Sequence, residues 1–429
     1  MNNQLVQELM QFISASPTMF HATHTLVDNL ESNGFSRLFL TDSWEIEKGG
    51  KYYAHINNSS IIAFIVNSCD IEKEGFRLVG THTDVPSFKV KAKAQMQNDG
   101  YVKLNTEIYG GPILNSWFDR PLSLAGRAVI KDNDILNPKQ LLVDFKKPIL
   151  VIPNLAIHMD REINKGKKIN PQKETLPILC YAEKHLETDL LLEEISKNLD
   201  VSIEDILGFD LFLYPVEEPM LVGIKEQFIS AARLDNLSMT YSGLYGLLNS
   251  KSDKGISVLV CYDNEEVGSR TRQGANAPFL RHTLERIINS LGKDRDAFFR
   301  SLANSFMISA DVAHLIHPNY TEKSDPTNKV LAGKGPAIKV SASYSYTTDS
   351  DSFAVFAGLC EANNIPYQTF FNRSDERGGS TIGPIATSQL GMRCVDVGTP
   401  MLAMHSAREL MTCEDFIYTC EALKAFYNL

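Results

Sequence analysis

The sequence predicts an α/β fold, with a mixed, largely parallel sheet and helices on both faces, interrupted by a β-rich insertion. From about residue 231 to the end, apolar strands alternate with helical stretches, which is typical of a largely parallel sheet. The first 90 residues supply further helices and strands. The residues between them show alternating strands and Gly/Pro turns. We therefore expect one α/β domain, made of residues 1–90 and 231–429, that is split by an inserted β-rich domain of residues 91–230.

The first 90 residues begin with two predicted helices. Ser16-Pro17 separates them, because proline ends a helical pattern. The apolar positions that mark the two helices are Leu5, Leu9, Met10 and Ile13, then Leu26 and Leu30. Runs rich in β-branched and aromatic residues follow between turn signals, and they predict strands over residues 52–56, 60–66 and 76–79.

The insertion is expected to consist mainly of strands. The pattern predicts strands over residues 101–108, 123–131, 140–152 and 211–214, with one helical stretch near residues 183–199. The basic stretch Lys165, Lys167 and Lys168 is interpreted as a solvated loop.

Composition excludes several classes of function. With 42 Lys+Arg against 52 Asp+Glu, the formal net charge is −10, so a phosphate backbone would be repelled and nucleic acid is not an expected partner. No apolar stretch approaches the roughly 18 residues that span a bilayer, so no membrane partner is expected. The amino terminus lacks the basic start and cleavage site of a signal peptide, and the 7 cysteines are scattered without a Cys-x-x-Cys pair. We therefore expect a cytoplasmic protein with reduced thiols.

Acidic residues and histidines recur at the ends of five apolar runs. Ligands of open α/β sheets bind outside the carboxyl ends of the strands, so these side chains are expected to converge. They are His82 with Asp84, Asp235, Glu265 with Glu266, Asp311, and His405. A cluster of carboxylates repels itself and is costly to desolvate unless cations neutralise it. Three carboxylates and two histidines are a plausible ligand set for two zinc ions, with one carboxylate bridging them.

Each of these signals also has a structural interpretation when it is taken alone. His82 could be a structural or surface histidine, Asp235 and Asp311 could cap helices, and Glu265-Glu266 could form a solvated turn. His405 could cap a short helix over residues 406–410. The joint pattern favours the metal site instead.

Two pairs of neighbouring residues suggest a division of roles. The carboxylate in His82-x-Asp84 could hold the imidazole tautomer, as partners of zinc-bound histidines do. Adjacent glutamates point in different directions, so one of Glu265 and Glu266 can bind a metal while the other acts as a general base on water.

The motifs together resemble the aspartyl aminopeptidase family of dinuclear zinc exopeptidases, and the match extends over essentially the whole chain. The motifs that carry it include Ser16-Pro17-Thr18, Thr81-His82-Thr83-Asp84, Leu155-Ala156-Ile157-His158, Arg233-Leu234-Asp235-Asn236, Glu265-Glu266-Val267-Gly268-Ser269, Asp311-Val312-Ala313-His314, and Met404-His405-Ser406.

The resemblance implies two divalent metal ions per subunit. In that assignment His82, Asp235 and Asp311 hold one ion, while Asp235, Glu266 and His405 hold the other. Glu265 is the general base and Asp84 orients His82. Zinc is the expected metal, and mixed imidazole and carboxylate ligation also suits manganese or cobalt.

The resemblance also implies a substrate site and an assembly. His314 and Lys339 match positions near the substrate, and His158 matches a histidine that reaches a neighbouring subunit's active site. The family forms a tetrahedral dodecamer whose contacts the inserted domain mediates. From local sequence alone, His158 would be structural in a strand-like run, Lys339 would be exposed on an edge strand, and His314 or His317 would lie on a helix surface.

The expected activity is removal of the first residue of a peptide, and the resemblance favours acidic residues at that first position. Lys339 is the candidate contact for an acidic side chain or for the peptide backbone, with Arg377 as a second cation. Residues 341–349 and 374–378 depart from familiar members of the family. The alternatives are a related carboxypeptidase, an N-acyl amino acid deacylase, and a non-catalytic scaffold. A scaffold has no physical reason to keep such a carboxylate cluster.

Overall fold

The computed structural model describes residues 3–376 and 378–429 and divides into two compact units. The first, which we name the α/β unit, contains the described residues up to Asp84, together with Pro219–Met404 and Glu409–Leu429. The second, the insertion unit, contains Val85–Glu218 and the short segment His405–Arg408. The expected domain boundaries, after residues 90 and 230, lie 6 and 12 residues later than the divisions after Asp84 and Glu218. The assignment of His405–Arg408 to the insertion unit was not anticipated.

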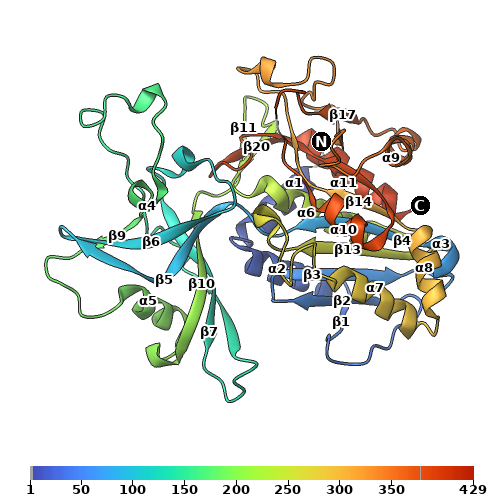
Figure 1. Ribbon diagram of the computed structural model, residues 1–429, viewed down its shortest axis with the longest axis horizontal. Helices are drawn as coiled ribbons and strands as arrows, with labels where there is room; N and C mark the ends of the chain where they lie inside the picture. The colour runs from blue at the N-terminus through green and yellow to red at the C-terminus, as the bar shows by residue number, and fades with distance from the viewer. Residues whose placement is uncertain (1–2, 377) are drawn as a thin grey trace. The chain divides into compact units, whose positions relative to one another are not determined.

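The α/β unit contains a mixed sheet of nine strands (Figure 1). In chain order they are β1 (Ser36–Arg37), β2 (Lys51–Ile56), β3 (Ser60–Val66), β4 (Phe76–His82), β13 (Ile256–Tyr262), β14 (Phe306–Ala310), β16 (Ala337–Val340), β17 (Gln368–Phe371) and β18 (Arg393–Gly398). In space the order is β1-β2-β3-β13-β4-β14-β18-β16-β17. The four strands from β13 to β18 are parallel to one another, while β3 and β16 flank them antiparallel. The predicted mixed, largely parallel sheet is confirmed.

Helices cover both faces of this sheet. On one face lie α1 (Asn3–Ser14), α2 (Met19–Ser32), α6 (Leu234–Asn249), α9 (Ser350–Ala362) and α11 (Cys413–Tyr427), and on the other α7 (Phe279–Ser290), α8 (Arg295–Ala303) and α10 (Ile382–Leu390). A short helix, α3 (Ile71–Glu74), precedes β4. Alternation along β13 shows why both faces need cover, because Leu259 enters one apolar cluster while Val258 and Val260 enter the other. The predicted helices on both faces of the sheet are confirmed.

A second, smaller sheet belongs to the same unit. Its five strands are β11 (Met220–Val222), β12 (Phe228–Ala231), β15 (Ala313–His314), β19 (Pro400–Leu402) and β20 (Glu409–Thr412), in the order β11-β12-β20-β19-β15. The run over residues 229–234, expected to be one strand ending at Asp235, is split between β12 and the start of α6.

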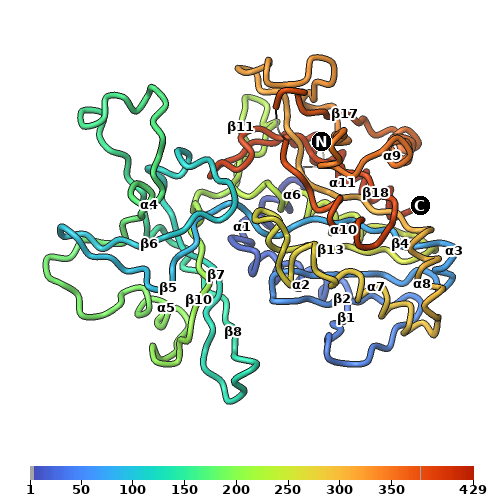
Figure 2. Tube along the Cα trace, viewed as in Figure 1, coloured from blue at the N-terminus to red at the C-terminus, as the bar shows by residue number. Residues whose placement is uncertain are grey.

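The insertion unit is built on an antiparallel sheet of six strands, with the order β8-β7-β10-β5-β6-β9. Its elements are β5 (Ser87–Asn98), β6 (Tyr101–Tyr109), β7 (Leu122–Ile130), β8 (Lys139–Asp144), α4 (Pro171–Glu174), β9 (Ile178–Tyr181), α5 (Leu190–Leu199) and β10 (Ile206–Pro215). Figure 2 shows these elements as one continuous stretch of chain.

Two elements of the insertion are shorter than expected. The strand predicted over residues 140–152 ends at Asp144, because Lys146 follows with a positive φ of 56° that breaks the extended chain. The helix predicted near residues 183–199 begins only after Asp189, whose side chain accepts hydrogen bonds from the N–H groups of Leu191 and Leu192. Among the helices that the structure describes, none is long and apolar enough to cross a membrane.

Candidate metal centre

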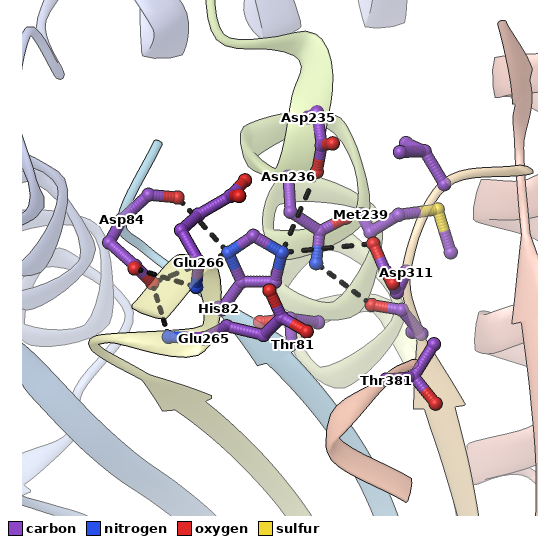
Figure 3. Close-up of polar contacts among 12 residues, drawn as sticks. Thr81, His82, Asp84, Asp235, Asn236, Met239, Glu265, Glu266, Asp311 and Thr381 are labelled. Atoms are coloured by element: carbon purple, nitrogen blue, oxygen red, sulfur yellow. Dashed lines mark hydrogen bonds and ion pairs between the residues drawn. The ribbon is translucent and has the colours of Figure 1, made fainter. Parts of the chain in front are cut away.

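The predicted centre is organised around the buried imidazole of His82, the last residue of β4 (Figure 3). Its Nδ1 donates to the backbone oxygen of Asp84 at 3.0 Å, so Nε2 is the ring atom that faces the neighbouring carboxylates. Nε2 lies 3.5 Å from Oδ1 of Asp235 and 3.7 Å from Oδ1 of Asp311. The three side chains thus direct one nitrogen and two oxygens into a common space.

Three adjacent parallel strands supply most of the centre. His82 ends β4, Asp311 follows β14, and Glu265 and Glu266 follow β13. Asp235 has a different origin, because it stands in the first turn of α6, after β12 of the smaller sheet. The expectation that all the motifs end strands of one sheet is therefore wrong for Asp235, although its carboxylate reaches the same place.

Asp84 joins the histidine to the two glutamates. Its Oδ1 accepts the backbone N–H of Glu265 and its Oδ2 that of Glu266, each at 3.1 Å. Oδ1 also lies 3.4 Å from Nδ1 of His82. Since Asp84 is fully buried, one carboxylate fixes both the imidazole and the turn that carries the two glutamates.

The charges of the cluster perturb one another strongly. Burial, together with the neighbouring carboxylates of Asp311, Asp84 and Asp235, raises the pKa of Glu265 to about 8 against the opposing effect of His82. Burial lowers the pKa of His82, but hydrogen bonds to Asp235, Asp311 and Asp84 outweigh it and raise this pKa well above its usual value. The cluster therefore favours added positive charge.

The donor atoms fit a divalent metal. The ligand atoms of His82, Asp235 and Asp311 lie within 4.8 Å of one another, as do those of His82, Glu265 and Glu266. Zinc binds both imidazole nitrogen and carboxylate oxygen, and a cation offsets the cost of burying several carboxylates together.

Comparison with known proteins identifies the family. The family described as "Aminopeptidase I zinc metalloprotease (M18)" matches residues 12–427, almost the whole chain. The chain belongs to this family. It is a zinc metalloaminopeptidase, a hydrolase that removes the residue at the amino terminus of a peptide. The predicted aminopeptidase activity is thereby confirmed, in preference to the carboxypeptidase, deacylase and scaffold alternatives.

Relatives resemble the aminopeptidase over its full length. A "Probable M18 family aminopeptidase 2" of Clostridium novyi is 51% identical over 428 residues, covering 99% of each chain. The protein of the same description from Pseudomonas entomophila is 44% identical over 431 residues, covering 100% of this chain and 99% of its own. The solved structure of the Ape4 and Nbr1 complex contains a chain with 36% identity and a TM-score of 0.94, covering 99% of this chain and 85% of that one. An aminopeptidase of Thermotoga maritima, at 23% identity and a TM-score of 0.87, covers 100% of this chain and 97% of its own and shares the fold.

Lys339 of the aminopeptidase lies beside the centre, in β16. The expectation of an exposed edge-strand residue is wrong, because β16 pairs with both β17 and β18 and Lys339 is only 3% exposed. Its Nζ lies 3.3 Å from Oδ2 of Asp311. Burial lowers the pKa of Lys339, but Asp311, Tyr346 and Asp396 raise it more, so its net shift is upward.

The other predicted substrate residues lie on exposed segments. His314 forms the short strand β15, not a helix surface, and its ring centroid lies 5.8 Å from that of Phe370. His158 stands in an exposed turn between Ile157 and Met159, so its interpretation as part of a strand is wrong. Arg377 lies outside the described residues.

His405 belongs to the insertion unit. There its Nδ1 lies 3.0 Å from the backbone oxygen of Gly111, and its own backbone oxygen accepts the N–H of Ile113. It does not begin a helix, because residues 406–408 form bends and β20 follows. The role of His405 as a ligand stays a prediction.

Two polar residues near the centre were not anticipated. The side-chain amide of Asn236 donates to the backbone oxygen of Ala310, next to Asp311, at 3.0 Å. Asp396 is a fully buried carboxylate in β18. The sequence held a signal for Asp396, because this aspartate stands between the apolar residues Val395 and Val397. A charge buried in such a run needs partners, which would have pointed to a polar site.

Proposed function

We propose that the aminopeptidase binds two divalent metal ions, with zinc as the native metal. His82, Asp235 and Asp311 would hold one ion, and Asp235, Glu266 and His405 the other, with Asp235 as the bridge. The observation that carries this proposal is the convergence of the buried Nε2 of His82 on the carboxylates of Asp235 and Asp311. When bound, zinc supplies a Lewis acid that polarises a carbonyl group and makes water more acidic.

Glu265 is proposed as the general base. It lies within the carboxylate cluster but is not needed for the ligand set of His82, Asp235 and Asp311, and burial gives it a pKa near the working pH of an enzyme. It would take one proton from the attacking water and pass that proton to the amine that leaves when the peptide bond breaks. Glu265 thus both accepts the proton and later donates it.

Substrate binding is proposed to involve exposed histidines. His314 of β15 and His158 of the insertion unit are the candidates to hydrogen-bond the substrate carbonyl as negative charge develops on its oxygen. We propose acidic residues at the first position of the peptide, because the motifs resemble those of aspartyl aminopeptidases.

We also propose that the chain assembles as a homo-oligomer, a tetrahedral dodecamer, through the insertion unit. A solved structure described as an mApe1 dodecamer is 26% identical to this chain, with a TM-score of 0.86, and covers 99% of this chain and 97% of its own. The turn around His158 supports such contacts, because it exposes apolar side chains: Leu155, Ile157 and Met159. The 7 free cysteines, most of them buried, are consistent with a cytoplasmic enzyme.

The decisive test is Glu265→Gln, assayed with amino-acid p-nitroanilides that carry Asp, Glu, Leu or Lys. Turnover should fall by about 10²- to 10⁴-fold, because a general base contributes that much, while the metal content stays at two ions per chain. Glu285→Gln, at a partly buried glutamate of α7 that pairs with Arg295, is the matched control and should keep full turnover. Wild-type turnover of Glu265→Gln would remove Glu265 from this role.

A further inference from the structure

Asp235 lies in an irregular first turn of α6. Its φ and ψ of −79° and 109°, and those of Asn236 at −117° and 20°, are not helical. The first N–H groups of a helix have no partner within the helix, so contacts from elsewhere in the chain are needed to fix a residue placed there. Because Asp235 is only 3% exposed, those contacts come from inside the protein.

Glu409 supplies a partner for the backbone of Asp235. Its Oε2 accepts the N–H of Asp235 at 3.1 Å, and its side chain is buried. Glu409 is the first residue of β20, where it pairs with Ala231 at the end of β12, just before α6 begins. A hydrogen bond to a charged acceptor is stronger than one between neutral groups, so the smaller sheet holds Asp235 through a strong contact.

Asn236 ties the same turn to the segment that carries Asp311 (Figure 3). Its side-chain NH₂ group donates to the backbone oxygen of Ala310 at 3.0 Å, and the whole residue is buried. Since a backbone oxygen only accepts, the NH₂ group and not the amide oxygen of Asn236 faces Ala310. This contact therefore connects the first turn of α6 to the last residue of β14, which Asp311 directly follows.

We propose that Glu409 and Asn236 are positioning residues for Asp235. Together they hold its carboxylate at a set separation from the carboxylate of Asp311. Both carboxylates face Nε2 of His82, at 3.5 and 3.7 Å, so a displacement of Asp235 changes the space in which the ligand atoms meet. Partners of metal ligands contribute to metal affinity in this way. The inference rests on the proposed role of Asp235 as the bridging ligand.

The test compares Glu409→Met with Glu409→Gln. Methionine removes the acceptor and keeps much of the side-chain volume, whereas glutamine removes only the charge, and its amide oxygen can still accept the N–H of Asp235. The zinc dissociation constant is measured by competition with a chromophoric chelator, and the melting temperature is measured without metal. We expect Glu409→Met to weaken zinc binding by about 10- to 100-fold, and Glu409→Gln by less.

Glu74→Met is the matched control for Glu409→Met. Glu74 is a partly buried glutamate whose Oε2 accepts the backbone N–H of Gly255 at 2.8 Å. It lies in α3, before the start of β4, whereas His82 is the last residue of that strand. Glu74→Met should lower the melting temperature but keep wild-type zinc affinity, which separates a positioning role from a loss of stability alone.

Asn236→Ala tests the second contact while Glu409 stays in place. It removes the NH₂ donor to Ala310, so zinc binding should again weaken by about 10- to 100-fold. Its control is Ser301→Ala in α8, which removes a buried hydroxyl that donates to the backbone oxygen of Ala297 at 2.7 Å. Ser301→Ala should keep wild-type zinc affinity.

The opposite results would overturn the inference. Wild-type zinc affinity in Glu409→Met would remove Glu409 from this role, and wild-type affinity in Asn236→Ala would remove Asn236. Equal losses in Glu409→Met and Glu409→Gln would show that the charge of Glu409, and not its bond to Asp235, is responsible.

Asp235→Ala separates this inference from the proposed function. If Asp235→Ala loses zinc while Glu409→Met and Asn236→Ala bind it normally, the inference alone fails. If Asp235→Ala binds two zinc ions with wild-type affinity, the proposed ligand set fails.

Discussion

The substitution Asp84→Asn tests whether one buried carboxylate controls the geometry of the whole centre. Both oxygens of Asp84 accept backbone N–H groups, those of Glu265 and Glu266, at 3.1 Å. Asparagine offers one oxygen and one NH₂ group in the same positions. Its NH₂ group would face one of these N–H groups, so that hydrogen bond is lost and the turn must shift.

The magnitude follows from that single lost bond. A hydrogen bond to a charged acceptor contributes about 1.5 to 3 kcal/mol. At about 1.4 kcal/mol for each factor of ten, this corresponds to a change of about 10- to 150-fold. Because the bonds of Asp84 hold the turn that carries both glutamates, we expect a loss of this size in kcat through Glu265, accompanied by weaker zinc binding through Glu266 and His82.

The assay compares Asp84→Asn with a control that removes an equivalent bond elsewhere. Asp415 is also fully buried and accepts two backbone N–H groups, those of Gly333 at 2.9 Å and Gly335 at 2.7 Å. Asp415→Asn should therefore lower the melting temperature by a similar amount but leave kcat and zinc affinity close to wild type. The reasoning is refuted if the two variants lose stability equally and Asp84→Asn keeps wild-type kcat and zinc affinity.

Three further predictions concern backbone packing, substrate binding and the bound metal. Gly398→Ala would place a Cβ 2.1 Å from the backbone oxygen of Asp311. It should therefore destabilise the fold by about 1 to 3 kcal/mol and weaken zinc binding. An unchanged melting curve would contradict this close packing. His158→Phe should lower turnover at least about tenfold without loss of metal, since side chains that hydrogen-bond the substrate carbonyl contribute that much or more. A monomer with wild-type turnover would exclude an active site that is shared between subunits. Removal of metal with a chelator should lower the melting temperature, and added zinc should restore it, because a cation neutralises the buried carboxylates and binds only the folded state. Scanning calorimetry with and without zinc measures this change. Identical melting curves would contradict the prediction.

Much of the centre could be predicted because apolar runs reveal strands. The runs before His82, Glu265 and Asp311 are continuous and bounded by turn signals, and they form the neighbouring strands β4, β13 and β14. Parallel neighbours end at the same edge of a sheet, so residues that follow them lie together. This reasoning needed only local sequence and one rule of topology.

The same reasoning failed for Asp235, whose preceding run is equally apolar. That run contains β12, which pairs with β20 in the smaller sheet, and then the first turn of α6. Membership of a sheet is decided by contacts between distant parts of the chain, and short apolar runs do not distinguish a strand from the start of a helix. Asp235 reaches the centre through α6 and not through a strand end.

Lys339 could not be predicted for a related reason. A lysine between Ile338 and Val340 is normally tolerated only where its ammonium group meets water, which is why an exposed edge strand was expected. In the structure an additional strand, β17, makes β16 internal, and Asp311 supplies the counter-charge from 28 residues earlier in the chain. Burial of a charge depends on such a distant partner, which local sequence does not reveal.

The insertion shows most clearly what only the structure provides. Its sequence suggested a module for assembly whose sole chemical residue was His158. The structure adds His405–Arg408 to this unit, because Ala407 enters its apolar core and Arg408 donates to the backbone oxygens of Glu217 and Glu218. The predicted zinc ligand His405 is therefore held by the insertion unit, through Gly111. Local sequence showed no sign of this placement, because the partners of residues 405–408 lie 190, 191 and 294 residues earlier in the chain.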